Sequence, residues 1–410
     1  MRLLVHASTC APGGSGEPPR PSYEEKLAAI ARLYNRRKRR LAFLHLAGAI
    51  VYLLVMLFFL TIGLAARAES ISERHFGASP TASAAVYAFF FFLLYRLACF
   101  PIHYESEFRL EHEFMLSKET FGEWLWRDLK TYLVSQFFLI LAVLVFYWFL
   151  RVAGELWWLY AAGTYIVFSI LICRLFPVLI FPLFFKRNPL PHGALVERLV
   201  AVAGKANFAI TSVHSFDLSR QTRKVTAGLV GLGKTREVLL SDNLLAGFSP
   251  EEIEAVFAHE LGHHVHKHFL RLFVFGSVLA LLGFYLLHVV LGRALPLLGF
   301  ADRGSIATLP LFVLALAVFS VVVRPVTNAY SRRLESESDA YAVRACGSAA
   351  PFTSALEKLA RANLADARPG KLAEIFLYDH PPLAARIARV RRVEEELKGA
   401  SGSRPPEARS

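Results

Sequence analysis

The segment with the clearest capacity for chemistry is the run HELGH at residues 259–263. Two histidines four positions apart lie one turn apart on the same face of a helix, which suits two ligands of a zinc ion. Glu260 projects beside them, where it could take a proton from a water molecule that the metal activates. His259 and His263 are therefore the predicted metal ligands, and Glu260 is the predicted catalytic base.

The residues before this motif predict that it lies inside a helix. Ser249 can cap the helix, Pro250 suits its first turn, and Glu252 completes a capping box. Apolar residues then recur at helical spacing as far as Leu261. The three histidines that follow the motif fit, at least in part, a helix end that is solvated at a membrane surface: His264, His266 and His268.

A catalytic zinc ion takes three protein ligands and keeps one position open, so a third ligand must come from another segment. The candidate is the predicted helix SRRLESESDA at residues 331–340. Glu335 and Asp339 are four positions apart and share a face, whereas Glu337 points away from them. Spacing does not choose between the first two: one would bind the metal and the other would orient a ligand histidine. The alternative is an ordinary solvated acidic face.

The composition indicates a membrane protein. Of 410 residues, 55% are hydrophobic and 19% are charged, which is more apolar than a typical soluble domain. The four cysteines lie far apart without C-x-x-C spacing, which argues against a cysteine zinc site and a disulfide framework. Six stretches are long and apolar enough to cross a bilayer. They lie at about 41–65, 84–102, 131–152, 156–183, 269–292 and 307–325.

Basic residues predict the orientation of these spans. The cluster RRKRR at residues 36–40 precedes the first span and should stay in the cytoplasm. The segments at 103–130, at 184–268 and after about 326 then lie on the same side. This rule explains much of the net charge of +13, and no nucleic-acid-binding motif is present. A metal-ion carrier would need more ionisable residues inside its spans than Arg96, Arg174 and His288.

Residues 228–235, GLVGLGKT, satisfy the pattern of a phosphate-binding loop. Such a loop follows an apolar strand and precedes a helix. Here a polar segment precedes it and the strand-like run EVLL at 237–240 follows it, so we interpret the region as a β-hairpin with its turn at 231–234. If the hairpin has an open edge, an extended peptide could add to it as another strand.

Five segments agree in order and spacing with one known family. They are LEHEFMLSKETFGEWLWRDLK at 110–130, FPLFFKRNPLP at 181–191, HELGH at 259–263, SRRLESESDA at 331–340 and DHPPLAARI at 379–387. Over about 40–393 the chain resembles the integral-membrane CAAX prenyl endopeptidases of the zinc metalloprotease type. This agreement is far more specific than the zinc motif alone.

The resemblance implies one zinc ion, with Glu335 as its third ligand and Asp339 as the partner of a ligand histidine. It also implies that His380 and Arg386 line the active site, where they could donate hydrogen bonds to the developing oxyanion. The family binds substrate by strand addition, which makes the substrate-binding candidates Thr226, Ala227, Gly228, Leu229 and Val230. The implied partners are the lipid bilayer and a peptide or protein, including one lipidated at its C-terminus.

Three features depart from the family pattern. We count six spans where the eukaryotic members have seven, His264 replaces the usual Trp, and Thr226-Ala227 replaces Asn-Ala on the substrate strand. These differences concern substrate preference more than chemistry. A quality-control membrane protease of the HtpX type shares HExxH and the downstream Glu, but it has fewer spans and lacks the 110–130 segment. An inactive relative that binds membrane-protein termini would not need the intact motif.

The expected fold is mainly α: a polytopic membrane bundle of about six transmembrane helices with a zincin-like α+β metalloprotease domain at the cytoplasmic face, containing a small β-hairpin or sheet. We expect the inner membrane if the source is bacterial and the endoplasmic reticulum if it is eukaryotic. The expected parts are a disordered or basic N-terminal segment (1–40), membrane helices 1–4 (41–183), the first part of the protease domain (184–268), membrane helices 5–6 (269–325), the second part of that domain (326–395) and a disordered tail (396–410).

Overall fold

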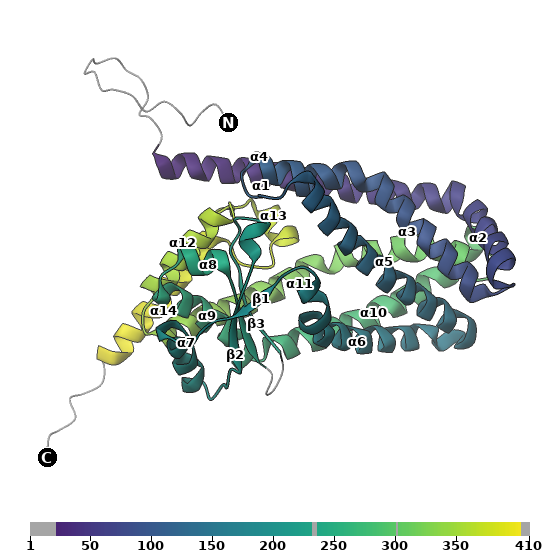
Figure 1. Cartoon of the computed structure of the whole chain (residues 1–410). Helices are drawn as coiled ribbons and strands as arrows, with labels where there is room; N and C mark the ends of the chain where they lie inside the picture. The colour runs from purple at the N-terminus through teal and green to yellow at the C-terminus, as the bar shows by residue number, and fades with distance from the viewer. Residues whose placement is uncertain (1–21, 232–235, 301, 403–410) are drawn as a thin grey trace, which may run out of the picture.

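Long helices form a bundle, and a smaller region of short helices and strands lies at one end of it (Figure 1). The structure is a computed structural model that describes residues 22–231, 236–300 and 302–402. The beginning of the first long helix and the end of the last helix lie at the same end of the molecule as the strands (Figure 1). Chain segments far apart in the sequence therefore meet there.

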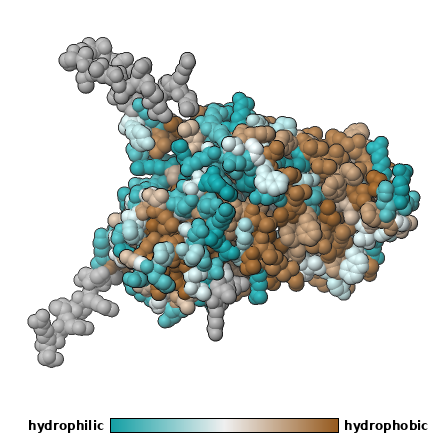
Figure 2. Space-filling view, in the orientation of Figure 1, coloured by the Kyte–Doolittle hydropathy of each residue, from teal (hydrophilic) through white to brown (hydrophobic). Residues whose placement is uncertain are grey.

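Six helices in the described part of the chain are long and apolar enough to cross a membrane, which confirms the predicted number. They cover Tyr23–Phe76, Pro80–Glu113, Phe121–Val152, Gly154–Leu183, His268–Leu297 and Ile306–Cys346. Hydrophobic side chains cover the surface of this bundle, whereas hydrophilic ones are frequent over the region with the strands (Figure 2). The two parts thus suit different surroundings.

The elements of the bundle and of the smaller region are as follows. The bundle contains α1 (Tyr23–Val55), the π-helical turn η1 (Met56–Leu60), α2 (Thr61–Phe76), α3 (Pro80–Tyr104), the π-helical turn η2 (Glu105–Arg109), α4 (Leu110–Glu113), α5 (Phe121–Val152), η3 (Gly154–Leu156), α6 (Trp157–Leu175), the π-helical turn η4 (Phe176–Ile180), η5 (Phe181–Leu183), α10 (His268–Leu297), η7 (Ile306–Thr308) and α11 (Leu309–Cys346). The smaller region contains β1 (Arg187–Pro189), α7 (Ala194–Lys205), β2 (Ser212–Phe216), η6 (Leu218–Arg220), β3 (Ala227–Val230), β4 (Glu237–Ser241), α8 (Asp242–Gly247), α9 (Pro250–Val265), α12 (Ala350–Ala362), α13 (Lys371–Leu377) and α14 (Leu383–Gly402).

Several helices extend beyond the apolar stretches that predicted them. The segment 1–40 was expected to be disordered or basic, but α1 already begins at Tyr23, where Ser22 and Glu25 form a capping box. Residues 1–21 lie outside the described residues. At the other end, α14 continues through the first part of the expected tail to Gly402. Hydropathy marks only the part of a helix that contacts lipid, so the polar extensions carry no such signal.

The strands form one mixed sheet in the order β1-β2-β4-β3. The β1–β2 and β3–β4 pairs are antiparallel, and the β2–β4 pair is parallel. The β3–β4 pair confirms the predicted hairpin and excludes the strand-then-helix context of a phosphate-binding loop. Most of the predicted turn, at 232–234, lies outside the described residues. Within the described residues β3 has one partner strand, so its other side is an open edge.

The apolar core of the smaller region takes side chains from both polar halves of the chain. Its buried members include Leu240, Leu244 and Phe257 from before α10, and Val343, Phe352 and Val390 from the segment that ends α11 and follows it. Spans α10 and α11 form the hairpin that brings the second half back, and α9 packs along α11 (Figure 1). The two halves therefore fold as one unit.

Candidate metal centre and active-site pocket

The helix that carries the HELGH motif begins as the sequence predicts. In α9 the Ser249 N–H donates to Glu252 Oε2 at 2.8 Å, and the Glu252 N–H donates to Ser249 Oγ at 3.3 Å. Glu252 also accepts hydrogen bonds from Ser354 Oγ at 2.6 Å and Lys358 Nζ at 2.7 Å. Because both partners lie on α12, the capping carboxylate also fixes α9 against the second half of the domain.

A close helix contact brings α9 and α11 together at the motif. A Cβ atom on Gly262 would lie 3.1 Å from Ser338 Cα and 3.2 Å from Tyr341 Cβ, which is tighter than ordinary van der Waals contact. Glycine therefore lets the two helices approach more closely than alanine would allow. Glu335 lies one turn before Ser338 on α11, so this approach sets its distance from His259 and His263.

Three potential ligand side chains converge at this contact. His259 Nε2 and His263 Nε2 are 3.3 Å apart, and His259 Nε2 lies 3.3 Å from Glu335 Oε2, whereas His263 Nε2 lies 3.3 Å from Glu335 Oε1. Ligands about 2.0–2.1 Å from a tetrahedral zinc ion stand about 3.3–3.4 Å from one another. The two imidazoles and the carboxylate are thus close enough together to bind one metal ion.

The burial of the triad also fits a bound cation. Glu335 is 6% exposed and His259 is 7% exposed. Glu335 Oε2 accepts no hydrogen bond within the described part of the chain. A buried carboxylate oxygen without a partner is costly unless a cation or a proton satisfies it. The described residues form one group of His, Cys, Asp or Glu side chains that could hold a metal ion, and it is this triad.

Asp339 lies behind His259 rather than at the centre of the triad. Its Oδ1 is 2.9 Å from His259 Nδ1, within reach of a hydrogen bond that a small rotation of the ring would align. Arg386 donates to the same carboxylate through Nε at 2.9 Å and Nη2 at 2.6 Å. Glu335 therefore faces the two Nε2 atoms, and Asp339 faces the back of one ring.

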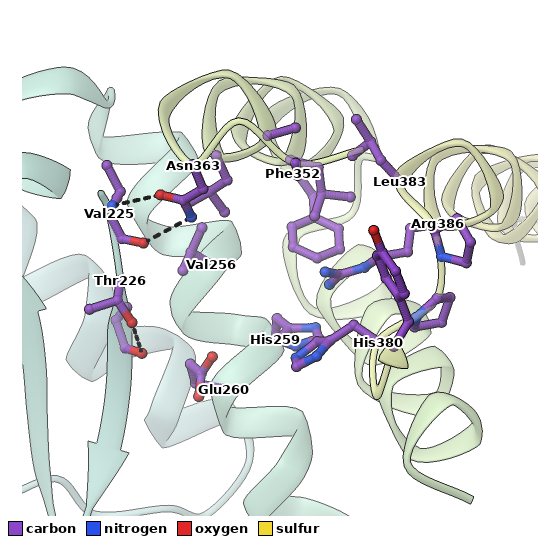
Figure 3. Close-up of a pocket in the computed structure, with 18 of the residues that line it drawn as sticks. Val225, Thr226, Val256, His259, Glu260, Phe352, Asn363, His380, Leu383 and Arg386 are labelled. Atoms are coloured by element: carbon purple, nitrogen blue, oxygen red, sulfur yellow. Dashed lines mark hydrogen bonds between the residues drawn. The ribbon is translucent and has the colours of Figure 1, made fainter. Parts of the chain in front are cut away.

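Arg386 and His380 reach the site from the C-terminal segment (Figure 3). Nε and Nη2 of Arg386 each donate one hydrogen bond to Asp339, so two of its five N–H groups hold that carboxylate. His380 Nε2 lies 3.3 Å from Glu335 Oε2, and its Nδ1 lies 2.8 Å from Asp379 Oδ1. That hydrogen bond to Asp379 raises the pKa of His380.

Glu260 lies on the pocket side of α9. A cavity of about 430 Å³ is lined by His259, Glu260, His380 and Arg386, together with Thr226 and Ala227 from the hairpin. Figure 3 shows Glu260 between His259 and Thr226. Burial raises the pKa of Glu260, with Glu335 adding to the effect while His259 opposes it. A carboxylate with a raised pKa is a stronger base than a solvated one.

Of the five substrate-binding candidates, Thr226 directly precedes β3 and the other four residues make up the strand. Thr226 and Ala227 line the pocket with Glu260, and Gly228 follows them in the strand. Leu229 and Val230 line a second cavity, of about 1010 Å³, whose other walls include α6 and η4. Asn363 holds the entry to the strand, because it accepts from the Val225 N–H at 3.0 Å and donates to the Val225 C=O at 3.3 Å (Figure 3).

The expectation that the histidines after the motif are solvated is wrong for His268. This side chain is 1% exposed, and its Nδ1 lies 3.1 Å from His263 Nδ1. His264 is half-buried against the hairpin, with Nε2 3.3 Å from the Leu229 C=O, whereas His266 is exposed. Helical spacing could not find His268, because Lys267 adopts a left-handed conformation (φ 55°) that ends α9 and redirects the chain.

Two family models match almost the whole chain. Residues 17–186 match "CAAX prenyl protease N-terminal, five membrane helices", and residues 189–394 match "Peptidase family M48". Within the first range the described residues contain four of the candidate membrane helices.

Individual proteins show the same similarity. The chain is 28% identical to "Uncharacterized metalloprotease YhfN" of Bacillus subtilis, over 75% of this chain and 73% of that protein. It is 28% identical to "Probable CAAX prenyl protease 1" of Schizosaccharomyces pombe, over 74% of this chain and 64% of that protein. The human "CAAX prenyl protease 1 homolog" is 25% identical over 71% and 70%. The crystal structure of S. mikatae Ste24p shares the fold, with a TM-score of 0.78, 23% identity and 89% of each chain covered.

Fold and site together define a multi-pass membrane metalloprotease, with its potential metal ligands at the junction of the bundle and the smaller region. The chain belongs to peptidase family M48, and it resembles CAAX prenyl protease 1 and Ste24p in sequence and fold.

Proposed function

We propose that the protein is a zinc-dependent endopeptidase in which His259, His263 and Glu335 bind one zinc ion. The observation that carries this proposal is the convergence of the two Nε2 atoms, 3.3 Å apart, on the Glu335 carboxylate, whose two oxygens each lie 3.3 Å from one of them. Two imidazoles and one carboxylate suit zinc, whereas magnesium and calcium prefer sites built from oxygen atoms alone. When bound, zinc would lower the pKa of a water molecule toward neutrality and polarise the peptide carbonyl group.

Glu260 would act as the general base. It faces the pocket beside His259, and burial raises its pKa, which makes the carboxylate a stronger base. It would accept a proton from the attacking water and then pass that proton to the leaving amine. His380 would donate a hydrogen bond to the oxyanion, since its ring lies beside Glu335 at the open side of the triad. The geometry supports Arg386 mainly as the group that holds Asp339 in place.

The substrate would lie along the open edge of β3. The Ser241 N–H donates to the Thr226 C=O, and hydrogen-bonded pairs alternate in an antiparallel ladder. Ala227 and Leu229 therefore present their N–H and C=O groups to the open edge, where an extended peptide could pair with them. The contact of His264 with the Leu229 C=O agrees with this assignment and suggests where the paired segment ends.

The walls of the two cavities support a substrate with an apolar portion. β3 connects the pocket beside Glu260 to the larger cavity, which is lined by Phe168, Ile172 and Val178 from the bundle. A peptide on β3 could thus place its reacting bond at the metal and an apolar or lipidated portion among the membrane helices. Matched peptides with and without a C-terminal prenyl group would test this, since the proposal expects the lipid to lower KM.

We also propose that the site faces the cytoplasm. The basic cluster at 36–40 lies on α1, whose beginning is at the same end of the bundle as the smaller region (Figure 1). Basic residues that flank a first span are retained in the cytoplasm. A cysteine at an exposed site of α7 should then react with an impermeant thiol reagent only in inverted vesicles. Labelling in right-side-out vesicles would refute this orientation.

The substitution Glu260→Gln tests the enzymatic proposal. The variant should keep one zinc ion per chain and lose hydrolysis of a fluorogenic peptide, because glutamine cannot accept the proton. Glu254→Gln is a matched control on the same helix, where Glu254 forms an ion pair with Arg198 instead of facing the pocket. Substantial hydrolysis by Glu260→Gln would refute the general-base role, and a wild-type chain that binds no zinc would refute the metal assignment.

A further inference from the structure

His268 stands behind the second ligand histidine in the place where Asp339 stands behind the first. Its ring contacts His263 Nδ1 through Nδ1 at 3.1 Å and Glu337 Oε2 through Nε2 at 3.1 Å. Arg271 Nη1 donates to the same Glu337 oxygen at 2.6 Å. The side chains of His263, His268, Glu337 and Arg271 thus form one continuous chain of hydrogen-bonding contacts.

The course of the backbone creates this contact. Lys267, with φ 55° and ψ 36°, separates α9 from α10. Because of this turn, His268, the first residue of α10, points back at the ring of His263 in the last turn of α9. A non-glycine residue in the left-handed region costs about 1 kcal/mol or more, so the surrounding contacts must hold the turn in place.

The hydrogen-bonding groups fit together in a single arrangement of protons. His263 directs Nε2 at the triad, which leaves its Nδ1–H to donate. His268 Nδ1 accepts that bond, and its Nε2–H then donates to the Glu337 carboxylate, which has no proton of its own to offer. Ser338 Oγ also lies 3.3 Å from His268 Nδ1, whose one lone pair accepts from the His263 N–H in this arrangement. The arrangement keeps the lone pair of His263 Nε2 directed at the metal position.

We propose that His268 is a positioning residue that fixes the tautomer and ring orientation of His263, with Glu337 and Arg271 anchoring it. The inference rests on the proposed metal site. It gives His263 a set of hydrogen-bonded partners comparable to Asp339 and Arg386 behind His259. The two sets differ in kind, because the partner of His259 is a carboxylate and the partner of His263 is a neutral imidazole. Partners of this type change metal affinity by about 10–100-fold when they are removed.

The test compares substitutions at His268 in the full-length protein in detergent. His268→Leu removes the acceptor, whereas His268→Asn places an amide oxygen near the position of Nδ1 and should restore the bond to His263. His266→Leu is the packing control: His266 is exposed and its ring stacks on that of His268 with centroids 5.5 Å apart, so the change disturbs the surroundings of His268 but leaves the acceptor for His263 in place. We expect His268→Leu to release zinc to a chelator about 10–100 times more readily than the wild type, and His268→Asn to remain within a few-fold of it.

The absorption spectrum of the cobalt-substituted protein provides a readout that altered packing alone would not move. The visible bands of bound Co²⁺ should shift in His268→Leu and remain near the wild-type position in His268→Asn and His266→Leu. If His268→Leu does not fold, Glu337→Gln is the alternative variant, because it alters the carboxylate that anchors His268 and leaves the buried ring in place. It should weaken zinc retention and shift the Co²⁺ bands in the direction expected for His268→Leu. Wild-type zinc retention with unchanged bands in these variants would overturn the proposal, whereas a wild type without zinc would instead refute the metal site itself.

Discussion

Gly262→Ala should separate the two helices that carry the ligands. Alanine favours a helix by about 1 kcal/mol over glycine, whereas overpacking a close contact costs about 1–3 kcal/mol. The added Cβ would meet Ser338 Cα at 3.1 Å, and that atom belongs to the backbone of α11, so no side-chain rotation can relieve the contact. The net loss of folding stability should therefore be at most about 2 kcal/mol.

The effect on the metal site should exceed the effect on folding. Relief of the contact requires α9 and α11 to move apart by a few tenths of an ångström, which approaches the tolerance of about 0.5 Å within which a metal site must be held. Because His259 and His263 lie on one helix and Glu335 on the other, both 3.3 Å distances from the histidines to the carboxylate would lengthen. We expect zinc affinity to fall about tenfold or more.

Thermal unfolding in detergent and zinc release to a chelator would measure the two effects separately. Gly204→Ala is the matched control, because Gly204 lies in α7 and a Cβ there would meet nothing within 4 Å. That variant should be as stable as the wild type or more stable, with the same zinc affinity. A Gly262→Ala protein that retains zinc as the wild type does would refute the claim that this contact sets the ligand geometry.

Three further predictions test the roles of other residues. Glu335→Gln should abolish zinc binding, whereas Glu337→Gln should only weaken it; equal loss of zinc, measured by elemental analysis, would contradict the ligand assignment. Arg386→Gln should lower thermal stability by about 3 kcal/mol, because it leaves the buried Asp339 carboxylate without its bidentate partner; an unchanged melting temperature would argue against that pairing. Ala227→Pro removes an N–H from the open edge without breaking the ladder to β4, so KM for a peptide should rise while zinc content stays at one; an unchanged KM would argue against strand addition.

Features that depend on local sequence could be predicted. The HELGH spacing, the capping box at Ser249, the six apolar stretches and the β3–β4 hairpin each follow from residues close together in the chain. Glu335 and Asp339 could be placed on one helix face, although spacing alone did not distinguish their positions. The geometry distinguishes them through a contact between α9 and α11, which are separated by more than forty residues.

Features that depend on tertiary contacts could not be predicted. The buried position of His268 follows from the left-handed turn at Lys267, for which a lysine in the sequence gives no signal. The bidentate bond between Arg386 and Asp339 joins α14 to α11, a pairing that no local pattern in the sequence indicates. The polar extension of α1 likewise lies beyond the reach of a hydropathy pattern.

Anomalous diffraction at the zinc absorption edge tests the central claim most directly. Crystals of the wild-type protein should show one peak about 2.0–2.2 Å from His259 Nε2, His263 Nε2 and an oxygen of Glu335. The peak should be missing in Glu335→Gln crystals. A wild-type map with no peak there, or with zinc bound by a different set of side chains, would contradict the account.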